Sequence, residues 1–288
     1  RGEVYLLTLV LTVVWLAVAG AALVSGLDYY LLPIEERAFS ELAALFSPTG
    51  LVGQGLGIVG TTMMLVGVTG YSARKRFAFL GRLGPLSAWL QVHIFLCTLG
   101  PFLVLLHTTF KFGGIVSIAF WSMAIVVASG VFGRYVYVRI PKALNGGFLS
   151  LAAIRDEVSE LSGNIAQQTG IAIADIDSVL RPRRAADPPS GLVGALAMAL
   201  REDLGHRRDR RRLRSFLKDH QVSKALEAPA LSLAAEQRRL RVQALLLQPF
   251  QRLFRYWHAV HLPLALVMLV IVTLHVGVSI LFGYTWIF

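Results

Sequence analysis

Two stretches decide the fold: residues 91–109, QVHIFLCTLGPFLVLLHTT, and residues 259–277, AVHLPLALVMLVIVTLHVG. Each is predominantly apolar and about as long as the roughly 20 residues that a helix needs to cross a bilayer. Each also contains two histidines separated by thirteen residues, which corresponds to about four helical turns and about 21 Å of helix. The two histidines of a stretch therefore share a helix face at two depths. The four histidines are His93, His107, His261 and His275.

The composition of the whole chain favours a membrane protein. The 288 residues are 55% hydrophobic and only 16% charged, against about 25% charged in a soluble domain. The mean hydropathy is +0.62, which argues against an ordinary water-soluble enzyme. The single cysteine, Cys97, excludes an internal disulfide framework, a Cys-based zinc site and a Cys-ligated iron–sulfur cluster. Metal chemistry on this chain would have to use histidine.

Five segments meet the length criterion, and we expect each to cross the membrane as a helix. They are residues 4–27, 51–71, 86–109, 115–138 and 256–282. The first is longer than the apolar region of a signal peptide and has no basic cluster ahead of it, so we expect it to be retained. The predicted fold is an all-α polytopic membrane protein with five transmembrane helices, four of which form a haem-binding core.

The distribution of lysine and arginine predicts the orientation, because short cytoplasmic loops carry an excess of positive charge. Residues 28–50 contain four acidic residues against the single Arg37, whereas residues 72–85 contain four basic residues and no acid. We therefore expect residues 28–50 outside, the N-terminus inside and the C-terminus outside. This topology favours a bacterial cytoplasmic membrane with a periplasmic C-terminus.

A polar insert, residues 139–255, contains most of the 28 basic residues and divides the chain into 1–138, 139–255 and 256–288. We expect it to be cytoplasmic and helical, over about 147–168, 191–220 and 231–253, with a helix-breaking stretch at 181–190. Its basic run, 206–214, suits membrane lipid, an acidic protein or a solvated helix face. The run has neither interleaved aromatics nor a recognisable nucleic-acid module, so no nucleic-acid partner is expected.

The predicted orientation makes segments 86–109 and 256–282 parallel. His93 is then level with His261 on the inner side, and His107 is level with His275 on the outer side. Two facing imidazoles between apolar walls provide the two axial nitrogens of a six-coordinate haem iron. The spacing therefore predicts two bis-histidine haems b. The alternative for a single membrane histidine is a hydrogen bond between helices.

The duplicated His-x13-His on two parallel helices resembles the diheme core of the cytochrome b superfamily, which includes the bc-complex cytochromes b and the ferric reductase-like oxidases. The resemblance covers the helices and implies two stacked haems that pass electrons through the membrane. The insert has no Gly-x-Gly-x-x-Gly after a strand, no βαβ alternation and no cysteine cluster. Electrons would therefore come from another subunit of a redox complex: a flavoprotein, an iron–sulfur protein or a multihaem cytochrome.

Three further residues are candidates for cofactor binding. His258 precedes His261 by three residues and would hydrogen-bond a haem propionate or replace His261 as ligand. Lys111 follows His107 and is assigned to the outer propionates, and Arg134 is a candidate for the inner ones. Anchoring of the topology is the simpler role for Arg134.

Glycines in three of the segments would make space for a macrocycle or for close helix packing. They are Gly53, Gly55, Gly57, Gly60, Gly67, Gly70, Gly100, Gly130 and Gly133.

The leading hypothesis is a diheme b-type cytochrome subunit, an electron-transfer component of an oxidoreductase complex, which exchanges electrons with partners or with quinone. One alternative is a haem-containing membrane reductase of a metal chelate or quinone. Another is a haem-free transporter in which the histidines relay protons. Against the transporter, the five segments contain no carboxylate, the group that proton paths commonly use.

Overall fold

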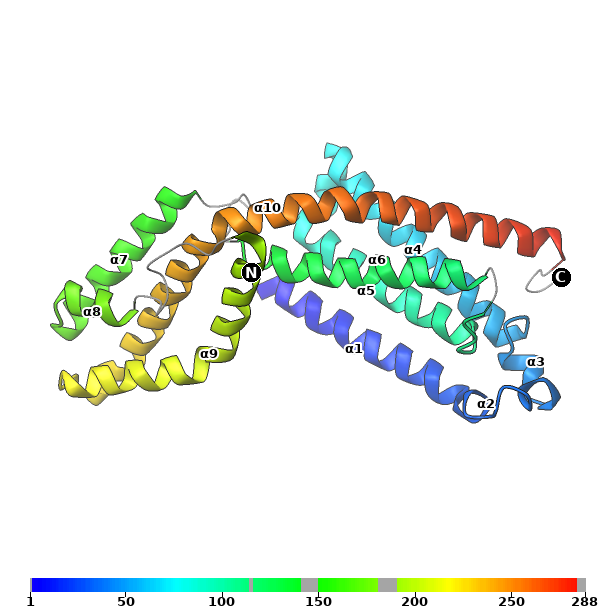
Figure 1. The fold of residues 1–288 in the computed structure, drawn as a ribbon, viewed down its shortest axis with the longest axis horizontal. Helices are drawn as coiled ribbons and strands as arrows, with labels where there is room; N and C mark the ends of the chain where they lie inside the picture. Colours follow the sequence, from blue (N-terminus) through cyan, green and yellow to red (C-terminus); the bar gives the residue numbers. More distant parts are fainter. Residues whose placement is uncertain (1, 114–115, 141–149, 181–190, 284–288) are drawn as a thin grey trace. The chain divides into compact units, whose positions relative to one another are not determined.

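The computed structural model describes residues 2–113, 116–140, 150–180 and 191–283, and in these ranges every regular element is a helix (Figure 1). Five helical stretches are long and apolar enough to cross a membrane, which confirms an all-α, multi-pass architecture. Their bounds are Tyr5–Ser25, Ala43–Arg76, Leu86–His107, Ser117–Tyr137 and Lys224–Leu281.

The helices group into two compact units. The first unit comprises Arg1–Val131 and Val260–Phe288, and the second comprises Phe132–Ala259. The sequence-based boundaries at 138/139 and 255/256 follow the change from apolar to charged composition, whereas these units follow packing.

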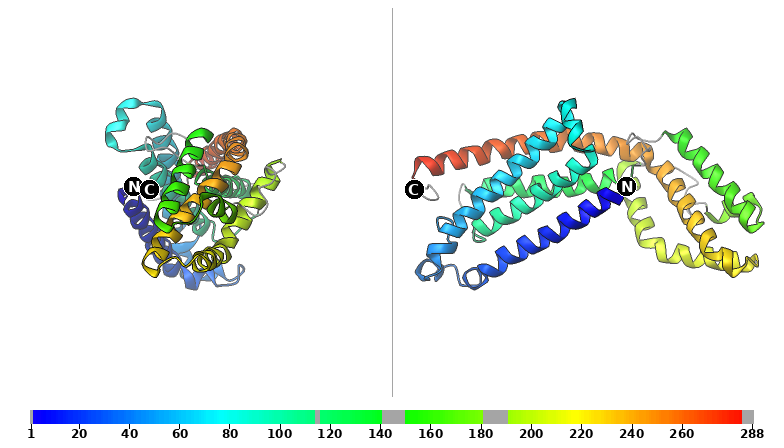
Figure 2. Two further views of the ribbon diagram at one scale, coloured as in Figure 1. Left: turned by 90° about the vertical axis from the view of Figure 1, so that its left-hand side faces the viewer. Right: turned by 180° about the vertical axis from the view of Figure 1, so that it is seen from behind.

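Within the first unit, α4 (Leu51–Arg76) and α5 (Leu86–His107) lie side by side, and α1 (Gly2–Ser25) packs against α5 (Figures 1 and 2). The buried face of α4 consists almost entirely of glycine. A Cβ atom at Gly60 would lie 2.6 Å from the carbonyl oxygen of Gly100 in α5. The two backbones are thus in direct contact, which is the packing that small residues permit between membrane helices.

A cap segment, residues 28–50, joins α1 to α4. It contains most of α2 (Leu27–Tyr30), together with η1 (Arg37–Phe39) and α3 (Ala43–Phe46). Three of its aromatic side chains, Tyr29, Tyr30 and Phe46, form a buried cluster with Leu106 of α5. Between α4 and α5 the chain forms a short helix, η2 (Ala78–Leu83), which has no buried residue.

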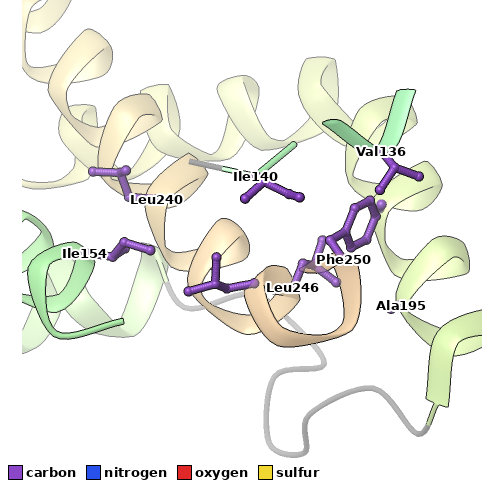
Figure 3. Packing of buried hydrophobic residues seen from close by; sticks show 9 residues of the cluster. Val136, Ile140, Ile154, Ala195, Leu240, Leu246 and Phe250 are labelled. Carbon is purple, nitrogen blue, oxygen red and sulfur yellow. The ribbon is translucent and has the colours of Figure 1, made fainter. Parts of the chain in front are cut away.

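The second unit contains the end of α6 (Val116–Tyr137), α7 (Leu151–Thr169), α8 (Ile173–Leu180), α9 (Gly191–Asp219) and the first part of α10 (Lys224–Leu281). Helices α7 and α9 occupy two of the predicted helical segments, whereas α8 was not predicted. The predicted breaker, 181–190, lies outside the described residues. Figure 3 shows the apolar core of this unit, formed by Val136, Ile140, Ile154, Ala195, Leu240, Leu246 and Phe250 among others.

One prediction about the elements is wrong. Residues 231–253 and 256–282 were expected as two helices, but α10 is continuous from Lys224 to Leu281. The predicted boundary marked a change in polarity, and a charged residue such as Arg255 does not end a helix because it retains its backbone donor and a high helix propensity. Even Pro263 lies within α10.

Candidate functional site

The two histidines of α5 are each held by a backbone carbonyl of α4. His93 Nδ1 donates to the carbonyl oxygen of Gly67 at 2.9 Å, and His107 Nδ1 donates to that of Gly53 at 2.8 Å. Because a carbonyl oxygen only accepts, the proton lies on Nδ1 and the lone pair of Nε2 is left for another partner. A hydrogen bond from one ring nitrogen to a carbonyl is the arrangement that fixes the tautomer of a metal-ligating histidine.

The acceptors repeat with the same spacing as the donors. Thirteen residues separate Gly53 from Gly67, just as thirteen separate His93 from His107. Two neighbouring helices that run in opposite directions rise at the same rate, so the same bond forms at two depths. These glycines were expected to serve helix packing or cofactor space, and the role of their carbonyls was not predicted. Every residue type has a backbone carbonyl, so the sequence does not single these two out. Which carbonyls face α5 depends on how α4 is rotated about its own axis.

The surroundings of the two α5 imidazoles differ. A Cβ atom at Gly57, one turn after Gly53, would lie 2.8 Å from Nδ1 of His107. One turn after Gly67 the corresponding residue is Tyr71, whose ring centroid lies 5.2 Å from that of His93. The His107 ring therefore requires a glycine next to it on α4, whereas the His93 ring lies beside the aromatic ring of Tyr71.

Cys97 lies near the same imidazole and fills a small space between α4 and α5. Its Sγ is 3.6 Å from His93 Nδ1, and a Cβ atom at Gly67 would lie 2.9 Å from this sulfur. These contacts suit a small packing residue.

On α10, His261 is oriented by a hydroxyl group of α6. Ser129 Oγ lies 2.9 Å from His261 Nδ1, and a Cβ atom at the adjacent Gly130 would lie 3.7 Å from the same ring. A hydrogen bond at Nδ1 fixes the ring so that Nε2 points away from this partner, as it does for the two histidines of α5. Ser129 was not singled out in the sequence, although it is one of the few hydroxyl groups in the predicted segment 115–138.

The structure brings His107 and His275 together. Their imidazoles interact electrostatically, and both are half-buried. Met268, midway between His261 and His275 on α10, packs in a buried cluster with Met64 of α4 and Met123 of α6. The predicted pair of His93 and His261 is named here the His93 level, and the predicted pair of His107 and His275 the His107 level.

The three accessory candidates have local contacts. Lys111 is exposed beyond the C-terminal end of α5. This end comes two residues earlier than predicted, because Thr109 and Phe110 have φ values of 51° and 60°, a left-handed conformation that does not continue an α-helix. In the second unit, His258 is exposed beside Trp257, and Arg134 lies 5.9 Å from the centroid of the Tyr137 ring.

No protein-family model, curated protein or solved structure matches the chain. Within the described ranges no three His, Cys, Asp or Glu side chains gather into a group that could hold a metal ion. A bis-histidine haem, however, takes only two protein ligands, because the porphyrin supplies the other four nitrogens. The imidazoles of His93 and His107, each held at Nδ1 by a glycine carbonyl of α4, fit that requirement.

Proposed function

We propose that the chain is a diheme b-type cytochrome subunit that carries electrons across a membrane between redox partners or quinone. The observation that carries the proposal is the matched repeat on α4 and α5. Two glycine carbonyls, thirteen residues apart, accept from two histidines thirteen residues apart and leave Nε2 available at both levels. The resemblance of the duplicated His-x13-His to the cytochrome b superfamily supports the same function.

In this proposal His93 and His261 hold the iron of one haem, and His107 and His275 hold that of the other. Bound haems would supply a reversible one-electron carrier at each of two depths. The protein contributes ligand identity, orientation and the apolar surroundings that set the redox potential.

The hydrogen bonds at Nδ1 support ligation in two ways. They fix the ring orientation before a metal binds, and a partner that accepts the Nδ1 proton increases the basicity of Nε2. The Gly67 and Gly53 carbonyls do both for His93 and His107, and Ser129 orients the ring of His261.

The accessory residues keep their proposed roles toward haem propionates: Lys111 toward the outer ones, Arg134 toward the inner ones, and His258 as a hydrogen-bonding partner of a propionate. Their exposed or half-buried positions suit groups that meet an anion at the membrane edge. Between His258 and His261, the half-buried His261 is the better ligand, because His258 is exposed.

The proposed orientation places the basic end of α4, with Arg74, Lys75 and Arg76, on the cytoplasmic side. The polar insert, residues 139–255, then lies in the cytoplasm, next to anionic membrane lipid. A flavoprotein, iron–sulfur or multihaem subunit would be the electron donor or acceptor, in keeping with a bacterial cytoplasmic membrane.

Purification and a pyridine haemochrome assay test this function. We expect two haems b per chain and a Soret band that shifts on reduction. A sample that takes up no haem when expressed with excess haem precursor would contradict the proposal and favour the haem-free transporter. Rapid oxidation of the reduced, isolated protein by a metal chelate or quinone would instead favour the reductase.

A further inference from the structure

A buried arginine connects the cap segment to the end of α5. Arg37 is only 7% exposed, and its guanidinium donates three hydrogen bonds to backbone carbonyls. Nε donates to Leu32 O at 2.9 Å, Nη2 to Tyr30 O at 2.7 Å and Nη1 to Thr109 O at 2.6 Å. The first two bonds are local, but the third joins residues 72 positions apart in the chain.

The charge on this guanidinium is not neutralised by a partner. All three acceptors are uncharged carbonyls, and in the described part of the chain no carboxylate is within ion-pair distance of Arg37. The acidic residues of the cap segment, Asp28, Glu35, Glu36 and Glu41, are all exposed. Burial of a charge costs folding free energy unless the charge is paired and hydrogen-bonded. Here the hydrogen bonds are present, but their carbonyl acceptors carry no negative charge to neutralise the guanidinium.

The carbonyl of Thr109 is two residues beyond His107. Thr109 has φ 51°, a conformation that a β-branched residue rarely adopts and that surrounding contacts must hold. The bond from Arg37 is one such contact. The packing of Phe110 on Tyr30, with ring centroids 5.6 Å apart, and of Leu106 in the aromatic cluster of the cap are others.

We infer that Arg37 is a positioning residue for the His107 level, and that it also places an unneutralised positive charge beside that level. This inference rests on the proposed function. Arg37 acts through Thr109, by fixing the end of the helix that carries His107. Its charge stabilises whichever form of a nearby redox centre carries one more electron, because a cation in a poorly hydrated site attracts added negative charge strongly. The midpoint potential at the His107 level is therefore raised by Arg37.

Three variants separate the charge from the geometry. Arg37→Gln removes the charge, whereas Arg37→Lys keeps it but cannot make three bonds in the planar arrangement of a guanidinium. Arg82→Gln removes an exposed cation of η2 and serves as the matched control. Each full-length protein is purified, titrated optically against redox potential and melted in detergent. The His107→Ala protein identifies which titration step belongs to the His107 level.

For Arg37→Gln we expect a lower midpoint potential at the His107 level, an unchanged potential at the His93 level and a lower melting temperature. For Arg37→Lys we expect the lower melting temperature with a potential close to that of the unaltered protein. Arg82→Gln should change neither quantity.

Two outcomes would overturn the inference, and they differ from failure of the function itself. If the unaltered protein has two haems and Arg37→Gln lowers only the melting temperature, Arg37 is merely structural. Equal shifts at both levels would also contradict it. If the unaltered protein has no haem, the proposed function fails first and this inference fails with it.

Discussion

At the scale of single residues, the site depends on partners that orient imidazole rings. Ser129 is the clearest case, because its hydroxyl on α6 lies 2.9 Å from Nδ1 of His261 on α10. Removal of an outer partner of a ligating histidine typically weakens metal binding by about 10-fold to 100-fold. Ser129→Ala should therefore weaken haem retention at the His93 level by about 10-fold or more, measured as transfer of haem to an apo-acceptor protein. Ser122→Ala is the control, since the Ser122 hydroxyl donates to the carbonyl of Ala119 in its own helix, and an equal effect of both would contradict the assignment.

Tyr30 offers a prediction about stability. Its hydroxyl is buried and has no hydrogen-bond partner, a situation that costs about 1–3 kcal/mol. Tyr30→Phe should thus leave the free energy of unfolding unchanged or raise it by about 1 kcal/mol, as measured by denaturation in detergent. A clear loss of stability would show that the hydroxyl has a partner after all.

The same tyrosine predicts a dependence on alkaline pH. Burial, with a smaller contribution from Tyr29, raises the pKa of Tyr30 above its ordinary value of 10.0. Above pH 10 the unfolded chain loses this proton before the folded chain does, so the folded state is destabilised as pH rises. Tyr30→Phe should make the melting temperature fall less steeply between neutral pH and pH 11. Parallel curves for the two proteins would contradict this.

At the scale of elements, α4 and α5 require glycine at particular positions. Gly57 has the His107 ring where a Cβ atom would be, at 2.8 Å. Gly57→Ala should therefore displace this imidazole and reduce haem at the His107 level while the His93 level keeps its haem, as seen in the haemochrome assay. Gly20→Ala on α1 is the control, because no atom lies within 4 Å of a Cβ atom there. Equal haem content in the two variants would contradict the geometry.

The middle of the same helix pair predicts a different effect. A Cβ atom at Gly60 would meet the backbone oxygen of Gly100, which cannot move aside as a side chain would. Overpacking of this kind costs about 1–3 kcal/mol. Gly60→Ala should thus lower the melting temperature and reduce haem at both levels, unlike Gly57→Ala.

The elements show how far sequence reasoning reaches. Apolar length alone located all five spans, because burial of a helix in lipid depends on composition. It wrongly divided α10 into two helices, because a change in polarity along the sequence is not a change in backbone conformation. Nor could it find the carbonyls of Gly53 and Gly67 or the role of Ser129, which depend on the rotation of each helix about its axis. Arg37 was noted only as a charge in an acidic loop, since its three acceptors are backbone atoms.

At the scale of the whole molecule, the account requires that the four histidines act as two pairs. A matched set of double variants tests this pairing most directly, with haem per chain as the single measured quantity. His107→Ala and His275→Ala should each leave one haem, and the double variant should still leave one, because both residues serve the same site. His93→Ala with His107→Ala should leave none, and His258→Ala should leave two. Loss of both haems from the His107→Ala, His275→Ala protein, or retention of haem when both α5 histidines are replaced, would contradict the account.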